Sequence, residues 1–245
     1  MIDFLIGCLA GIFIGATGIG AGSILTPLLI LRGHDPLTAV TTGLLALIAA
    51  RTVGSLQHIL SGHWPARHGL RVLIGGVAGA GLGFVIVRQM IANTALIESV
   101  LRMTLGVVLL SISLTGFVSG ILRKRLPEAG GGVIALAAVG TGTAVATTSA
   151  GSGTLLGALV FPATEWRVHE FSAVSNVFGL FAGLIGIAAY SRFDRFDPSL
   201  LGSVMAGSVM GIVMGVLASR RMQRDHFAIA LRVLTIVLGL ALIMA

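Results

Sequence analysis

The sequence predicts an all-α, polytopic membrane protein built from two similar, inverted halves. Its 245 residues are 56% hydrophobic and 10% charged, with a mean hydropathy of +1.02, whereas soluble domains carry about 25% charged residues. Long uncharged runs alternate with short polar loops, and the second part of the chain repeats features of the first. So few charges cannot cover a water-facing surface, and we therefore expect the solvent of this chain to be lipid.

Eight apolar segments follow from the uncharged runs, four in each half. The segments of the first half are 4–31, 36–62, 72–87 and 103–122. The segments of the second half are 129–164, 171–191, 198–219 and 227–245. Most of them reach the length of about 20 residues that a spanning helix needs. Runs rich in Gly, Ser and Thr interrupt the first and fifth segments, at 15–23 and 140–154.

The two halves match residue by residue. Three sets recur in order: Gly20, Gly22 and Leu25 return 131 positions later as Gly151, Gly153 and Leu156; Gly75, Gly79 and Gly83 return 132 positions later as Gly207, Gly211 and Gly215; and Leu101-Arg102 returns 130 positions later as Leu231-Arg232. A near-constant offset indicates duplication. We expect a first membrane repeat at 1–122, a cytoplasmic linker at 123–130 and a second membrane repeat at 131–245.

The basic loop residues distinguish two topologies. If all eight segments span, seven basic residues face six, which orients nothing. If the two interrupted segments instead enter the membrane and return, one side holds nine: Arg67, Arg71, Arg123, Lys124, Arg125, Arg167, Arg220, Arg221 and Arg224. The other side then holds four: Arg32, Arg88, Arg192 and Arg195. This bias favours re-entrant segments, an odd number of crossings in each half and therefore inverted repeats.

The two interrupted segments are the first candidate site. Clustered glycines destabilise a helix by about 1 kcal/mol each, and lipid cannot satisfy the backbone groups that a break exposes. We therefore predict breaks that face a polar ligand, with Ser23 and Thr154 as N-caps of the half-helices that follow. The residues assigned to the site are Gly18, Gly20, Gly22, Ser23, Ser149, Gly151, Ser152, Gly153 and Thr154. The alternative is that these glycines only permit close helix packing.

Two polar side chains inside apolar segments complete the candidate site. Arg51 lies well within 36–62, and an intramembrane Arg usually faces a cavity or a partner. Its planar fork suits carboxylate, sulfite or sulfonate oxygens; the alternatives are snorkelling or a structural pair with Glu98. Asn176 either contacts the same ligand or ties helices together. Ala182 stands at the position that matches Arg51, so the predicted site is asymmetric.

Other polar and small-residue patterns receive weaker interpretations. His58, His63 and His68, and likewise Glu165, His169 and Glu170, could take part in proton coupling but are more typical of solvated loop ends. The stripes Gly75/Gly79/Gly83 and Gly207/Gly211/Gly215 predict helix packing, within one chain or in a homodimer.

Several classes of function are excluded. The net charge of +7 comes from loop arginines without a basic face or aromatic platform, which argues against nucleic-acid binding. Cys8 is the single cysteine, so no disulfide or thiolate metal site forms within the chain, and we predict neither a metal nor a cofactor. The glycine runs lack a preceding strand, and no G-x-S-x-G elbow is present, so no enzyme is predicted. The first apolar run is interpreted as a retained segment and not as a cleaved signal peptide.

Several motifs carry a family resemblance. The motifs are G-I-G-A-G-S-I-L-T-P-L-L-I-L at 18–31, G-H-D-P-L-T-A-V-T-T-G at 33–43, H-x-x-x-G-H-W at 58–64, the glycine stripe of the third segment and a weaker second copy of the first motif at 149–162. With these motifs the chain resembles the sulfite exporter TauE/SafE family, also called toluene sulfonate uptake permeases. This resemblance implies a permease for sulfite, sulfonate or a related organic anion.

The sequence therefore predicts a secondary transporter of a small anion in a bacterial inner membrane. The anion would be held between the two breaks near Arg51, and a proton or cation gradient or the membrane potential would drive it. A non-transporting membrane scaffold or assembly factor, and an anion channel, are the alternatives.

Overall fold

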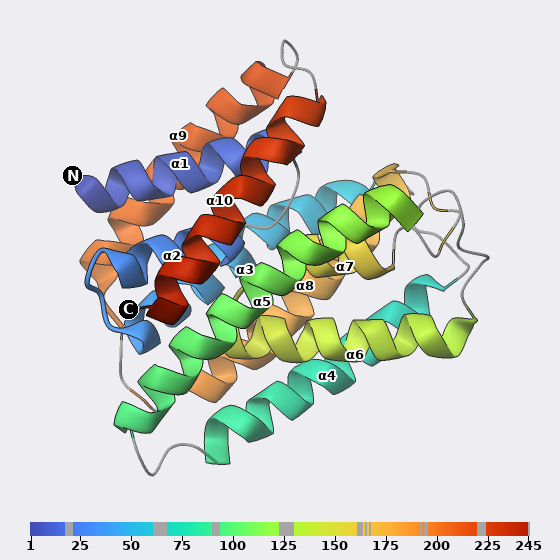
Figure 1. Cartoon of the computed structure of the whole chain (residues 1–245), viewed down its shortest axis with the longest axis horizontal. Coiled ribbons are helices and arrows are strands. Elements are labelled where there is room, and N and C mark those ends of the chain that lie inside the picture. Colours follow the sequence, from blue (N-terminus) through green and yellow to red (C-terminus); the bar gives the residue numbers. More distant parts are fainter. Residues whose placement is uncertain are drawn as a thin grey trace.

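The computed structural model describes residues 1–17, 22–60, 68–89, 94–122, 130–160, 164, 166, 168–191, 193, 196–219 and 224–244. Every regular element of these residues is an α-helix. In chain order the helices are α1 (Ile2–Thr17), α2 (Gly22–Leu31), α3 (Pro36–Leu60), α4 (Gly69–Gln89), α5 (Thr94–Leu122), α6 (Gly131–Thr148), α7 (Thr154–Leu159), α8 (Val168–Tyr190), α9 (Pro198–Ser219) and α10 (Arg224–Met244). The predicted all-α, polytopic class is confirmed (Figure 1).

Short local signals set several helix ends. Asp35 and Asp197 each precede a proline, and their carboxylates accept hydrogen bonds from the amides of Thr38 and Leu200 at 3.0 Å. They are N-caps followed by Pro at the first helical position, where its missing N–H costs nothing. At the end of α2, Gly33 takes a positive φ of +101° and the amide of His34 bonds back to the carbonyl of Leu29. This Schellman turn separates α2 from α3.

Three helices of the described residues are long and apolar enough to cross a membrane: Gly69–Gln89, Gly131–Thr148 and Glu170–Tyr190. Shorter apolar stretches lie at Ile2–Phe13, Gly22–Leu31, Pro36–Thr52, Pro198–Met214 and Val233–Met244. The helix at Gly131–Thr148 is long enough to span but ends inside the protein, where Thr148 and Ser149 are buried and the chain turns back.

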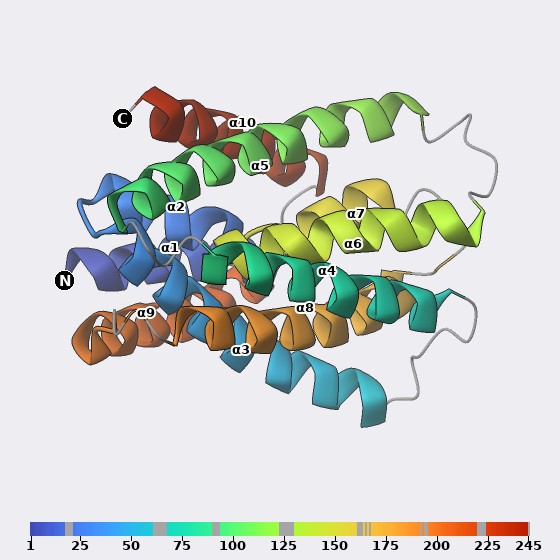
Figure 2. The ribbon, with the colours of Figure 1, turned by 90° about the horizontal axis from the view of Figure 1, so that it is seen from below.

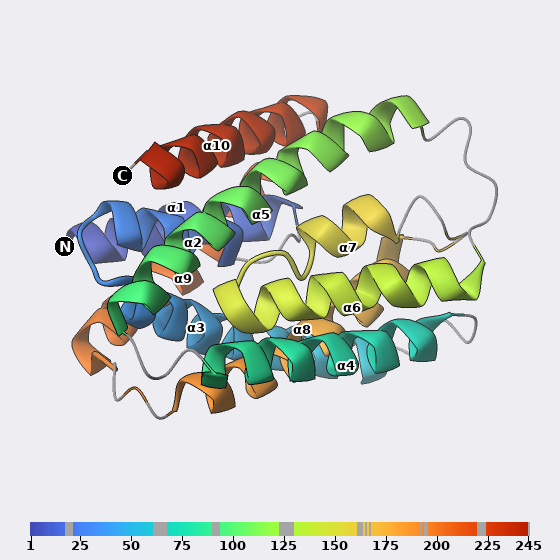
Figure 3. The same cartoon turned by 60° about the horizontal axis from the view of Figure 1, so that its bottom comes forward.

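The two interrupted segments form helical hairpins. His34, just after α2, bonds through Nε2 to the Asp3 carboxylate at 3.0 Å, so α1 starts and α2 ends at the same end of the molecule. In Figure 3, α6 and α7 also run in opposite directions, and this second hairpin opens toward the other end of the molecule. Both termini lie at the end where the first hairpin opens (Figure 2). This course matches the re-entrant topology; the inverted repeat itself stays a prediction.

The breaks are narrower than the glycine-rich runs predicted. Residues 140–148 were expected to belong to the second break, but they continue α6, because the hydroxyls of Thr141, Thr143, Thr147 and Thr148 bond carbonyls four residues back. These bonds satisfy the hydroxyl groups inside a helix. In the first segment α1 extends to Thr17 and α2 begins at Gly22, so 15–17, 22 and 23 are helical; residues 18–21 lie outside the described residues.

Glycine stripes pair helices of one half with helices of the other. A Cβ on Gly79 of α4 would lie 2.0 Å from the carbonyl oxygen of Val139 in α6. A Cβ on Gly211 of α9 would lie 2.1 Å from that of Cys8 in α1. Backbones therefore touch along α4–α6 and α1–α9, the closest form of membrane helix packing. The packing interpretation of these stripes is confirmed for contacts within the chain; the side-chain position of Gly215 lies outside the described part.

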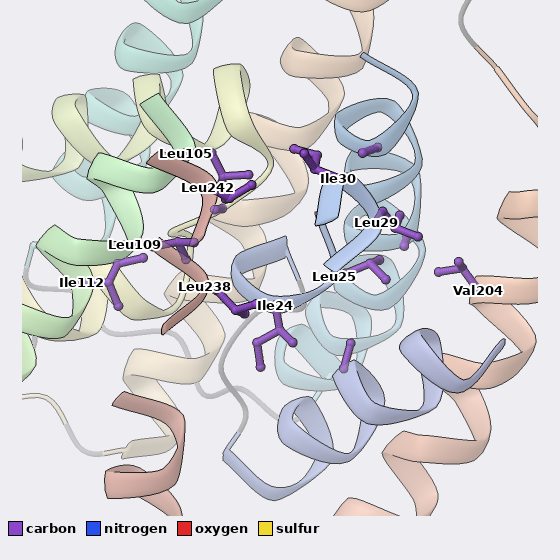
Figure 4. Packing of buried hydrophobic residues seen from close by; sticks show 14 of the residues in the cluster. Ile24, Leu25, Leu29, Ile30, Leu105, Leu109, Ile112, Val204, Leu238 and Leu242 are labelled. Carbon is purple, nitrogen blue, oxygen red and sulfur yellow. The ribbon is translucent and has the colours of Figure 1, made fainter. Parts of the chain in front are cut away.

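Apolar side chains fill the spaces between the helices. One cluster joins α2 to α5 and α10, where Ile24 lies beside Leu238 and Leu105 beside Leu242 (Figure 4). A second cluster surrounds Phe178 of α8 and joins it to α3, α4, α6 and α7. Large apolar residues also cover outward faces, such as Leu70, Ile74 and Leu82 of α4. Such faces fit a lipid solvent.

Candidate functional site

The second interrupted segment leaves the helix at residues 149–153, a shorter stretch than the predicted 140–154. Ser149 ends α6 in the left-handed conformation, with φ 61°, and Gly151 has φ +106°. Only glycine adopts the latter value without strain. Residues 149–153 therefore leave the helix deep in the protein, where Ser149 and Ser152 are 1% and 2% exposed.

The two hairpins meet at this break. A Cβ on Gly22 would lie 1.9 Å from the carbonyl oxygen of Ser149, so the backbones of α2 and the second break are in direct contact. The hydroxyls of Thr26 and Ser149 are 2.6 Å apart, and those of Ser23 and Thr154 are 3.3 Å apart. Gly43 of α3 leaves room for the Thr26–Ser149 pair, because a Cβ there would lie 2.2 Å from Thr26 Oγ1.

The predicted capping roles of Ser23 and Thr154 are wrong. The residue before α7 is Gly153, which makes no side-chain capping bond, and Thr154 is the first helical residue. Ser23 lies inside α2, which begins at Gly22. The hydroxyls of these two residues, which stand 131 positions apart, bond each other instead, because the hairpins bring them face to face.

Arg51 reaches the second break from α3. Its terminal nitrogens donate to Asn176 Oδ1 at 2.9 Å, to Ser152 Oγ at 3.1 Å and, more weakly, to Ser175 Oγ at 3.5 Å. Asn176 is itself oriented by a bond from Nδ2 to the Ser172 carbonyl at 2.8 Å. The structure thus brings together Arg51, Ser152 and Asn176, which the sequence singled out separately.

Arg51 is 4% exposed and is the one buried charged side chain of the described residues. It forms no ion pair with a described carboxylate, and Glu98 is not a partner. Its hydrogen-bond acceptors are neutral oxygens, which satisfy N–H groups but do not neutralise the charge. Snorkelling and a Glu98 pair therefore do not explain this residue. The arrangement is a positively charged site lined with hydroxyl and amide groups.

Ser175 is a site residue that sequence reasoning did not assign. Besides accepting from Arg51, its hydroxyl donates to the carbonyl of Ser152 at 3.3 Å and so links α8 to the break. Its position directly before Asn176 was the available signal. Gly18 and Gly20 lie outside the described residues, as do His63, Glu165 and the side chains of His58 and His169. His68 bonds Arg71 at the exposed start of α4.

Apolar helices, two helical hairpins and a charged site at their meeting point are the features of a multi-pass membrane protein with a polar centre. The family model described as "Sulfite exporter TauE/SafE" matches residues 3–242, and the chain belongs to this family. It is a family of membrane transporters, as the names of two curated relatives also indicate.

The first relative is the probable membrane transporter protein YjnA of Bacillus subtilis (strain 168), 26% identical over 252 residues that cover 98% of each chain. The second is the probable membrane transporter protein YunE of the same organism, 33% identical over 105 residues, which cover 42% of this chain and 36% of the relative. No solved structure matches the chain.

Proposed function

We propose that this membrane transporter moves a small anion, such as sulfite, a sulfonate or a related organic acid, across a bacterial inner membrane as a secondary transporter. The anion would bind at the second helix break beside Arg51. The observation that carries the proposal is a buried guanidinium whose charge no described carboxylate neutralises. A buried, unpaired charge is costly by several kcal/mol, and an anion at the fork would remove this cost.

The chemistry around Arg51 supports an oxyanion. Guanidinium presents N–H donors in a planar fork that matches carboxylate and related oxyanions. Ser152, Ser175 and Asn176 occupy this fork now. All three are neutral, so an anion can displace them without separating an ion pair.

The contacts around the site support movement between the hairpins. The helix pairs α1–α9 and α4–α6 touch backbone to backbone at several glycines, whereas α2 and the second break meet at one glycine, Gly22, and at two hydroxyl pairs. A hydroxyl hydrogen bond contributes only about 0.5–1.5 kcal/mol. We propose that alternating access separates the hairpins at these weak bonds while the glycine-packed pairs move as units.

The test is anion flux into liposomes that contain the purified protein, measured for sulfite, thiosulfate, sulfonates and small carboxylates. We expect saturable flux that Arg51→Lys lowers by about tenfold or more, because lysine keeps the charge but loses the fork. Gly22→Leu should abolish flux by forcing the hairpins apart. Arg88→Lys is the matched control, because Arg88 stands over the Phe84 ring at a helix end, outside the site.

Three outcomes would overturn the proposal. If no anion moves and none raises thermal stability, the anion assignment is wrong. If flux is unsaturable and independent of any counter-ion, the protein is a channel. If Arg51→Lys and Gly22→Leu both insert and behave as the unmodified protein does, a scaffold role is the better explanation.

A further inference from the structure

Ser55 is a second polar residue of α3 that the structure leaves unexplained. It is 4% exposed, and its buried Oγ has no hydrogen-bond partner among the residues that the structure describes. Other hydroxyls in the same helix bond carbonyls four residues back, as Thr41 does to Leu37 at 2.8 Å and Thr52 to Ile48 at 2.8 Å. The same bond from Ser55 would go to the carbonyl of Arg51, and it is not made. A buried hydroxyl without a partner is unfavourable and needs an explanation.

The packing of α3 on α8 places Ser55 at the level of the Arg51 fork. A Cβ on Gly183 would contact Ile48, and a Cβ on Gly179 would lie 3.1 Å from Arg51 Nε. Later residues of α8 thus face earlier residues of α3, as expected for two antiparallel helices. One turn further, residue 175 of α8 falls opposite residue 55 of α3. Arg51 extends in this same direction, since its terminal nitrogen reaches Ser175 and Asn176.

The two side chains also share a face of α3. Residues four apart in a helix are neighbours on its surface, and both Arg51 and Ser55 are buried. The fork and the hydroxyl therefore lie on the side of α3 that packs on α8. Protein oxygens bond the fork, whereas the hydroxyl has no partner among the described residues.

We propose that Ser55 is a further substrate-binding residue, whose hydroxyl donates a hydrogen bond to one oxygen of an anion held by Arg51. The ligand class is an oxyanion with at least two oxygens, one for the fork and one for the hydroxyl. This inference rests on the proposed function. It explains why Ser55 forgoes the bond to its own helix, because a donor committed to the Arg51 carbonyl is not available to a ligand.

The test compares Ser55→Ala with two other serine variants in the purified full-length protein, with sulfite and methanesulfonate as probes. For Ser55→Ala we expect the apparent KM for flux to rise about tenfold, the loss typical of a hydrogen bond to a charged group. Without ligand its unfolding temperature should stay the same or rise, because the Oγ bonds no described protein group and its burial is unfavourable.

The controls separate burial from binding. Ser208 of α9 also has a buried Oγ without a partner among the described residues, so Ser208→Ala should leave KM unchanged and should not lower stability. Ser113 of α5 bonds the Leu109 carbonyl at 3.1 Å and Thr235 Oγ1 at 2.7 Å, so Ser113→Ala should lower the unfolding temperature and leave KM unchanged.

Each result has one meaning. An unchanged KM for Ser55→Ala, with flux still sensitive to Arg51→Lys, overturns the Ser55 assignment and leaves the proposed function standing. A fall in unliganded stability like that of Ser113→Ala shows a structural role and also overturns it. If the unmodified protein moves neither probe nor any other anion, the proposed function fails first.

Discussion

Gly22→Ala tests the contact on which the site depends. Gly22 opens α2, and its Cα faces the backbone of the second break at Ser149. An added Cβ would stand 1.9 Å from the Ser149 carbonyl oxygen and 2.6 Å from the carbonyl carbon. Ordinary contact begins near 3.4 Å, so one hairpin must withdraw from the other by about 1.5 Å. The atoms in the way are backbone, which cannot rotate aside as the end of a side chain could.

The expected magnitude follows from this displacement. Overpacking a filled interior costs about 1–3 kcal/mol. A shift of that size would also stretch the Thr26–Ser149 and Ser23–Thr154 pairs, now 2.6 and 3.3 Å apart, beyond hydrogen-bond length. Each lost bond costs about 1 kcal/mol. The higher helix propensity of alanine offsets at most about 1 kcal/mol of this loss in the free energy of unfolding. The net destabilisation should be about 2–4 kcal/mol, with loss of anion flux.

The assay is chemical unfolding in mixed micelles, followed by flux in liposomes. Gly81→Ala is the matched control: Gly81 lies inside α4, and nothing is within 4 Å of its Cβ position. The same chemical change there should leave flux intact and stability equal or higher by up to about 1 kcal/mol. If Gly22→Ala unfolds at the same denaturant concentration as Gly81→Ala, the hairpins do not meet as described and the argument for the site fails.

Three further predictions concern helix packing, pH and charge selectivity. Gly142→Ala should lower the free energy of unfolding by about 1–3 kcal/mol, because its Cβ would lie 2.2 Å from the Gly76 carbonyl oxygen. Gly140→Ala should not lower it, because nothing lies within 4 Å of that Cβ position. Equal unfolding curves for the two variants would contradict the α4–α6 contact. Hydrogen bonds from the Leu200 amide and from Ser199 hold the pKa of the Asp197 carboxylate below its ordinary 3.8. The carboxylate therefore stabilises the start of α9 above pH 3.8, and this stabilisation is lost as the pH falls through the lower folded pKa. Amide exchange at the start of α9 should accelerate over that pH range, and Asp197→Asn should remove the pH dependence. Methanesulfonate, which carries one negative charge, should inhibit transport of a labelled substrate more strongly than sulfate, which carries two. Arg51 is the one buried charge of the described residues, so a bound dianion would leave a net charge in a low-dielectric site. Equal inhibition by the two anions would count against the site.

Much of the candidate site was predictable because its residues violate local expectations. Arg51 is a charge inside an apolar segment, Asn176 an amide inside another, and Ser149 to Gly153 a run that cannot easily stay helical in lipid. Each anomaly is visible without knowledge of its neighbours. Ser55 was not assigned, because a serine inside a membrane helix usually bonds its own backbone. Its lack of a partner appears only when the described acceptors around it have known positions.

The wrong predictions share one cause. Thr141, Thr143, Thr147 and Thr148 resemble a break when they are read as a composition, yet each hydroxyl finds a carbonyl of the same helix. Ser23 and Thr154 resemble N-caps, yet they bond each other across the hairpins. In both cases several acceptors or donors could satisfy the hydrogen-bonding capacity of the hydroxyl. Which of them bonds it depends on how the helices pack.

The sequence by itself determined where helices form and which solvent surrounds them. Hydrophobicity and charge act residue by residue, so the apolar runs, the Asp-Pro helix starts and the Ser-Ala-Gly-Ser-Gly interruption at 149–153 need no distant partner. Only the tertiary structure decided that α1 packs on α9, that α4 packs on α6 and that Arg51 meets Ser152 and Asn176. The residues that meet are more than a hundred positions apart for α1–α9 and for Arg51, and about sixty apart for α4–α6. Which of them meet depends on how the helix surfaces fit together, and the order of residues along the chain does not show that fit.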